Sequence, residues 1–229
     1  VKCENCPDAA IVAHDLEKLH HGRVFISAIY PKILNPYTGP WPDGFDLRTE
    51  EATNIVKELI GEPLGIPAGA INRIHFPGKP LVSLIDREWA KHVNELIARK
   101  SEVNLAVDVS QNKEERKVKA TVTATYTEPQ ADPMYLTILI TESKIISPQL
   151  TGSGKKDDYE HNFVLRKAIT PYYGIELAKE VRQKGRTFEK GFEIDIDPEW
   201  VYENCQIIVV ANRHAETNKN ILQVLAVDL

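Results

Sequence analysis

The chain has 229 residues, 42% of them hydrophobic, so it is long enough for one large domain or two ordinary ones, each with its own core. Acidic and basic side chains are interspersed and give a net charge of −5, which predicts neither a nucleic-acid surface nor a polybasic membrane anchor. The longest apolar runs have the length of a strand, far below the roughly 20 residues of a transmembrane helix. We therefore expect two domains, no nucleic-acid partner and no transmembrane segment.

Cys3 and Cys6 form a Cys-x-x-Cys pair at the start of a helical pattern that ends near His20. At the mouth of a helix, unpaired backbone N–H groups and the positive end of the helix dipole stabilise a thiolate on the first sulfur. The second sulfur lies one turn deeper, where it can resolve a mixed disulfide. The pair predicts thiol–disulfide exchange with Cys3 as the nucleophile, Cys6 as the resolving thiol and no cofactor. A structural disulfide stays open as the alternative.

The same two cysteines could also be two of the four ligands of a zinc site. A structural zinc site has four ligands, and the chain has no second Cys-x-x-Cys, so we expect no metal. The distant Cys205 precedes an apolar run at 207–211, which predicts a buried, inert thiol in a strand.

The first hundred residues alternate between helical and extended patterns. Residues 7–20 predict an amphipathic helix on a sheet, with Pro7 in its first turn, and residues 23–30 predict a buried strand. A loop rich in Pro and Gly follows at 31–44. The next helix can be capped by Asp46 or Thr49, carries a buried stripe, and ends at Gly61; its stripe is Ala52, Val56, Leu59 and Ile60.

Two more strands and a helix complete this half. Residues 70–76 predict the first strand, and the second follows the Pro and Gly turn at 77–80. The last helix is expected at about 86–100, with Trp89 and Val93 on its apolar face.

This order of elements after the Cys-x-x-Cys pair resembles a thioredoxin-like α/β domain. In that family a cis-proline opens the strand beside the pair, and Pro67 occupies the matching place. The resemblance implies that Pro67 is the backbone platform against which a substrate peptide pairs. The family also has a central strand before the pair, where this chain has only Val1 and Lys2, so we expect a preceding strand to be missing from this sequence. Glu4 beside Cys3 should oppose the thiolate and make a weaker oxidant.

From residue 102 the pattern changes to a period of two, which indicates strands. A hairpin is expected at 103–109 and 118–126. Five further strands are expected at 134–142, 162–169, 186–196, 205–212 and 221–227. Seven short strands with little helix predict a β-sandwich. We therefore expect a thioredoxin-like domain at 1–100 and an all-β domain at 101–229.

Four short motifs together resemble a family of Bacteroidetes outer-membrane proteins typified by a Porphyromonas outer-membrane antigen. They lie at residues 3–8, 66–73, 141–149 and 158–166, in the same two-domain order. The resemblance implies an exported lipoprotein of the cell envelope, tethered to the outer membrane. It also implies a thioredoxin-like domain followed by an immunoglobulin-like β-sandwich. Because the chain starts at Val1 without a signal-like segment, we expect the lipid-bearing cysteine to lie upstream.

Other polar and aromatic residues suggest sites, but each has a simpler interpretation. His161, Asn162 and Arg166, with Tyr159 nearby, invite a catalytic role; in a strand, however, His161 and Asn162 point to opposite faces. We expect these residues, like Glu142 and Gln149, to tie loops to the fold through hydrogen bonds. His14, His20 and His21 are interpreted as surface histidines. The aromatic residues of the long loop either shape a partner groove or pack against the second domain; they are Tyr37, Trp41 and Phe45.

Two functions from different classes therefore remain. The first is an exported thiol–disulfide oxidoreductase that acts through Cys3, Cys6 and Pro67 on protein thiols or disulfides. The second is a non-catalytic surface binding or adhesion lipoprotein in which the Cys3–Cys6 disulfide is structural and an unknown surface ligand is the partner.

Overall fold

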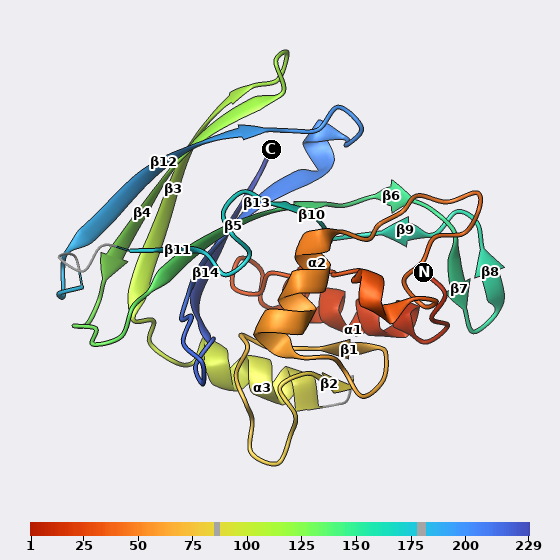
Figure 1. Cartoon of the computed structure of the whole chain (residues 1–229), viewed down its shortest axis with the longest axis horizontal. Coiled ribbons are helices and arrows are strands. Elements are labelled where there is room, and N and C mark those ends of the chain that lie inside the picture. The colour runs from red at the N-terminus through yellow and green to blue at the C-terminus, as the bar shows by residue number, and fades with distance from the viewer. Residues whose placement is uncertain (85–87, 178–181) are drawn as a thin grey trace. The chain divides into compact units, whose positions relative to one another are not determined.

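The computed structural model describes residues 1–84, 88–177 and 182–229, which form a mixed α/β fold with several antiparallel sheets (Figure 1). Contacts between Cα atoms divide the chain into two compact units. The first unit contains Val1–Arg99 and Ser143–Lys167, and the second contains Lys100–Glu142 and Ala168–Leu229. The expected division into domains at 1–100 and 101–229 stays a prediction.

The helices of the first unit begin and end close to the expected positions. They are α1 (Cys6–Leu19), the 3-10 turn η1 (Lys32–Leu34), α2 (Glu50–Asn54), its continuation η2 (Ile55–Ile60) and α3 (Glu88–Ile97). Pro7 lies in the first turn of α1, as predicted. The Thr49 hydroxyl accepts a hydrogen bond from the Ala52 N–H at 3.0 Å, so Thr49 is the residue that caps α2. The predicted start of the last helix at Asp86 lies outside the described residues.

Helix α2 continues into η2, which is a π-helical segment. The Gly61 N–H donates to the Val56 carbonyl at 2.8 Å, and Gly61 then ends the helix at a φ of 84°, which favours glycine. The predicted apolar stripe is buried at Ala52, Val56 and Leu59. This stripe anchors the helix in the first unit.

The predicted packing of α1 on a sheet is wrong. Only Leu16 of its apolar stripe is buried, and Leu19 is 71% exposed. The expected strand at 23–30 does not form; its only ladder contact is a parallel bridge between Ala28 and Val164. Without a sheet beneath it, α1 buries one residue where a full stripe was expected.

Short antiparallel pairs replace the expected central sheet of this unit. β1 (Ala68–Gly69) pairs with β2 (Ser83–Leu84). The expected strand at 70–76 is wrong, because a turn interrupts it: the Ile74 N–H donates to the Ile71 carbonyl at 3.1 Å. Two further pairs come from the 143–167 segment; they are β6 (Ile145–Ile146) with β9 (Glu160–His161), and β7 (Gln149–Thr151) with β8 (Gly154–Lys156).

The second unit consists of two antiparallel sheets around one core (Figure 1). One sheet has the order β12–β4–β3, and the other contains β5, β13 and β14 in that order, with β11 beside β5. The strand bounds are β3 (Val103–Asn112), β4 (Lys117–Tyr126), β5 (Tyr135–Glu142), β11 (Ile175–Glu176), β12 (Thr187–Asp195), β13 (Cys205–Asn212) and β14 (Ile221–Asp228). The remaining strand, β10 (Val164–Ala168), lies in the first unit except for its last residue.

These strands confirm the period-two analysis of the sequence. Every second residue of β4 from Val118 to Tyr126 is at most 1% exposed, as expected for one buried face of a sheet. β13 begins and ends at the residues expected, and Cys205 at its start is 1% exposed, so its prediction as a buried thiol is confirmed. Alternation was thus enough to locate β4, and a continuous apolar run was enough to locate β13.

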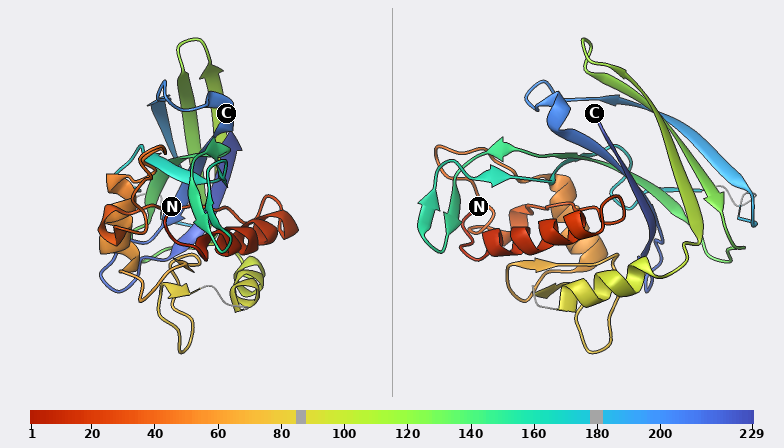
Figure 2. Two further views of the ribbon diagram at one scale, coloured as in Figure 1. Left: turned by 90° about the vertical axis from the view of Figure 1, so that its right-hand side faces the viewer. Right: turned by 180° about the vertical axis from the view of Figure 1, so that it is seen from behind.

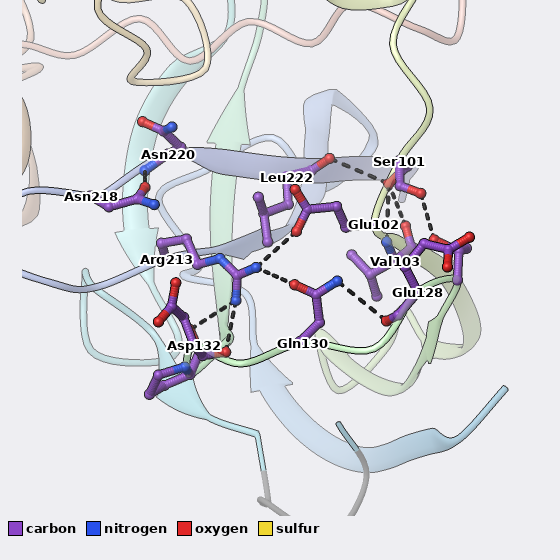
Figure 3. A network of polar contacts seen from close by, with 12 residues as sticks. Ser101, Glu102, Val103, Glu128, Gln130, Asp132, Arg213, Asn218, Asn220 and Leu222 are labelled. Carbon is purple, nitrogen blue, oxygen red and sulfur yellow. Dashed lines mark hydrogen bonds and ion pairs between the residues drawn. The ribbon is translucent and has the colours of Figure 1, made fainter. Parts of the chain in front are cut away.

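Arg213, directly after β13, organises a buried polar network that the sequence analysis did not identify (Figure 3). Its guanidinium donates to the Asp132 carbonyl and to a Glu102 carboxylate oxygen, both at 2.8 Å, and also to the Gln130 side-chain oxygen and the Pro133 carbonyl. Because Arg213 is only 6% exposed, these acceptors replace the water it loses on folding. The network joins the loop before β5 to the end of β13.

We predict that Arg213→Ala lowers the free energy of unfolding by about 2 kcal/mol, because it removes the part-buried hydrogen bonds that this buried guanidinium donates. Urea unfolding measures the change. Lys119→Ala is the matched control: Lys119 pairs with Glu193 at 3.4 Å while 75% exposed, so its loss should cost less than about 0.5 kcal/mol. Equal effects of the two substitutions would contradict a structural role for the Arg213 network.

Candidate functional site

Cys3 and Cys6 are joined by a disulfide, with their Cα atoms 5.4 Å apart. Cys6 is the first residue of α1 and is half-buried, whereas Cys3 lies before the helix and is 8% exposed. Asn5 precedes the helix without a capping hydrogen bond from its side chain. The more accessible cysteine is therefore the second of the pair, the one that the sequence analysis assigned as the resolving thiol.

The backbone around Cys3 is held by residues that lie far away in the sequence. The Gln149 side-chain amide donates to the Cys3 carbonyl at 2.9 Å, and Gln149 is 3% exposed. The Leu150 N–H donates to the Val1 carbonyl at 2.9 Å, and the Lys2 N–H donates to the Tyr37 carbonyl at 2.7 Å. Figure 2 shows the hairpin of β7 and β8 beside the N-terminal segment. The disulfide segment is thus enclosed between the 31–44 loop and β7.

His161 lies in a second buried cluster within the same unit. Its Nε2 is 3.2 Å from the Ser147 carbonyl, and its Nδ1 is 3.0 Å from the Tyr30 hydroxyl. A carbonyl only accepts, so Nε2 carries the proton and Nδ1 accepts from Tyr30, which is one neutral tautomer with both ring nitrogens satisfied. Burial lowers the pKa of His161 to about 4 and raises the pKa of Tyr30. His161 therefore ties a loop into the fold, as expected.

The other motif residues also make structural hydrogen bonds. The Asn162 side-chain oxygen accepts from the Lys144 N–H at 2.9 Å, and Glu142 accepts from the Val201 N–H at 2.8 Å. The Tyr159 ring meets the His161 ring edge-on, with centroids 4.8 Å apart. These contacts agree with the structural roles expected for Asn162, Glu142 and Tyr159.

Pro67 follows a cis peptide bond, so the expected isomer at Ile66–Pro67 is confirmed. It is half-buried and lies directly before β1. Among the described residues, no polar contact joins Pro67 to either cysteine. The structure therefore brings Cys3 and Cys6 together, and a shared catalytic role for Cys3, Cys6 and Pro67 stays a prediction.

The aromatic residues of the long loop have divided roles. Trp41 packs against the small core formed by Val1, Leu47, Ile145 and Val164. The ammonium groups of Lys2 and Lys155 lie 5.3 and 5.2 Å from the centroid of its ring. Tyr37 and Phe45 are 51% and 63% exposed. Trp41 therefore helps to close the disulfide segment, while the other two remain at the surface.

Within the part of the chain that the structure describes, no group of three His, Cys, Asp or Glu side chains could hold a metal ion. Among the same residues, no helix is both long enough and apolar enough to span a membrane.

Sequence reasoning identified the cysteines but gave Gln149 only a general structural role. The contact that matters joins Gln149 to Cys3, residues 146 apart in the sequence. A polar residue that begins a short strand and is buried gives no local signal of its partner. The one available hint was that residues 3–8 and 141–149 belong to the same set of motifs.

Comparisons with known proteins place most of the chain in one family. Residues 62–229 match the model of the family described as "Outer membrane protein Omp28". Comparison with curated proteins finds no match.

Two solved structures are similar at low identity. A domain of the outer membrane lipoprotein Omp28 from Porphyromonas gingivalis is 15% identical, with a TM-score of 0.37, over 57% of this chain and 90% of that one. A Bordetella pertussis protein assigned as ApaA is 14% identical, with a TM-score of 0.23, over 57% of this chain and 98% of that one.

We predict that His161 makes the first unit less stable in mild acid. The unfolded histidine binds a proton below about pH 6.5, but the buried one stays neutral until about pH 4, so stability falls as the pH decreases through this window. The full loss is about 3 kcal/mol. Urea unfolding between pH 4 and 7 should show a smaller pH dependence for His161→Gln than for the wild type. The control is His21→Gln, whose side chain is 92% exposed; a similar change in both variants would contradict this role.

We predict that Gln149→Leu makes the disulfide about tenfold easier to reduce, because losing a buried hydrogen bond of about 1.4 kcal/mol favours local opening. The measurement is the rate of reduction by dithiothreitol, read by alkylation and mass spectrometry. Gln206→Leu is the matched control, since Gln206 donates to Asp228 at 2.8 Å in the second unit. Equal rates in all three proteins would show that Gln149 does not protect the disulfide.

Proposed function

Because this chain belongs to the Omp28 family of outer membrane proteins, we propose that it is an outer-membrane lipoprotein that works as a non-catalytic binding module. The lipoprotein assignment follows the description of the Porphyromonas gingivalis protein. In this proposal a lipid anchor upstream of Val1 tethers the protein to the membrane, and the partner is a ligand at the membrane surface. The Cys3–Cys6 disulfide is then a structural clip.

The observation that carries this proposal is the burial of Cys3. Cys3 is 8% exposed, and its carbonyl accepts a hydrogen bond from the Gln149 side chain, which is itself only 3% exposed. Exchange needs an attacking thiolate to reach one sulfur in line with the disulfide, and reactive cysteines are partly exposed. Enclosure of the first cysteine by β7 opposes that approach.

At the level of domains, we propose that the first unit is a thioredoxin-like scaffold and the second an immunoglobulin-like β-sandwich. The order of α1, α2 and α3 after the cysteine pair supports the first proposal, although the central sheet is replaced by short strand pairs. Two antiparallel sheets that share one core support the second. A sandwich offers loops and strand edges for binding, which suits a module without an active site.

Thiol–disulfide exchange with protein thiols or disulfides is the second candidate, and one observation favours it. Cys6 is half-buried at the first position of α1, where free N–H groups and the helix dipole stabilise a thiolate. In this mechanism Cys6 or Cys3 attacks the substrate disulfide, the other cysteine resolves the mixed disulfide, and Pro67 pairs with the substrate backbone.

A redox titration separates the two candidates. In glutathione or dithiothreitol buffers, the structural clip predicts a reduction potential below about −300 mV, whereas oxidoreductases lie between about −270 and −120 mV. The variants Cys3→Ser and Cys6→Ser should trap no mixed disulfides with other envelope proteins. A potential in the oxidoreductase range together with trapped partners would overturn the proposal.

We also predict that removing the disulfide costs stability. For a loop closed between residues 3 and 6, the chain-entropy estimate is about 2 kcal/mol. Urea unfolding of the double variant Cys3→Ser with Cys6→Ser measures this loss, with Cys205→Ser as the single-cysteine control. An unchanged unfolding midpoint in the double variant would show that the disulfide is not a clip.

A further inference from the structure

Arg73 lies at the centre of a tight turn in the first unit. The Ile74 N–H donates to the Ile71 carbonyl at 3.1 Å, and the two central residues, Asn72 and Arg73, have φ values of 49° and 53°. Positive φ at both central positions defines a type I′ turn, which favours Asn at the first and Gly at the second. Asn72 follows this preference. Arg73 stands where the backbone favours glycine.

The side chain of Arg73 is buried as well. The residue is 7% exposed, and its Nη1 has no hydrogen-bond partner among the described residues. Burial lowers the pKa of the guanidinium to about 10, so it stays charged at neutral pH. A buried charge without a partner is strongly unfavourable.

Arg213 shows what a structural buried arginine looks like in this same chain. It is 6% exposed, but its guanidinium donates to two carbonyls, a carboxylate and a side-chain amide. Arg73 has similar burial and none of these acceptors among the described residues. Its charge therefore has no visible role in holding the first unit together.

We propose that Arg73 is the recognition group of an oxyanion-binding site, at which its guanidinium donates paired hydrogen bonds to two oxygens of a ligand carboxylate or phosphate. Guanidinium is the cation whose planar donor pair matches these anions. Retention of an unfavourable residue at a strained turn position is typical of functional sites. The bound anion would supply the acceptors that the fold lacks. This site is independent of the role proposed for the disulfide.

The test is thermal unfolding of the whole chain with inorganic phosphate or acetate, titrated at constant ionic strength against chloride. We expect a saturable rise in Tm with at least one of the two anions; the anion that acts identifies the ligand chemistry. In Arg73→Met the saturable rise should vanish, and the Tm without anion should exceed that of the wild type, because a buried unpaired charge is gone. Arg73→Lys, a point charge without the donor pair, should bind at least tenfold more weakly.

Arg99→Met is the control, since Arg99 is an exposed arginine that forms an ion pair with Glu95 on α3. It should keep the full saturable rise of the wild type, while any general salt effect appears equally in every variant. The proposal is overturned if the wild type shows no saturable response to either anion, or if Arg73→Met retains it. It is also overturned if Arg73→Met lowers the Tm in the absence of anions, because the guanidinium then has its partner within the fold.

Discussion

The first unit depends on a long-range constraint: residues 143–167 return to the N-terminal segment and bond to it. The Gln149 side-chain amide donates a hydrogen bond to the Cys3 carbonyl, and the Leu150 N–H donates one to the Val1 carbonyl. The same segment supplies Val164, which makes the bridge to Ala28, and His161, which bonds Tyr30. These contacts bury Cys3, and this burial supports the proposal that its disulfide is structural.

The two units differ in how they satisfy their buried polar groups. In the second unit, regular strands pair their own backbones and Arg213 meets several acceptors, so the unit is explained by its own contacts. The first unit has short strand pairs and relies on individual side chains such as Gln149 and His161. Arg73 is the exception in this unit: among the described residues, its buried Nη1 has no hydrogen-bond partner. This difference between the two units supports the binding role proposed above.

The sequence predicted structure best where the signal is local. Alternation located β3 and β4, an apolar run located β13, and Thr49 marked the start of α2, because each depends on neighbouring residues. Residues 23–30 and 70–76 are as apolar as strands but do not form them. Their outcome depends on pairing with distant segments, which apolar content cannot reveal. For the same reason the cysteine pair was recognised from its spacing, while the burial of Cys3 by Gln149 was not.

Hydrogen exchange with mass spectrometry tests most directly whether the disulfide clips these segments together. Peptides covering residues 1–6 and 145–151 would be compared in the oxidised and reduced protein. If the disulfide is a clip, reduction should increase exchange in both peptides, because the bonds from Leu150 and Gln149 open with it. Unchanged exchange at 145–151 after reduction would contradict this, since Cys3 and Cys6 could then open and close freely as an exchange-active pair does.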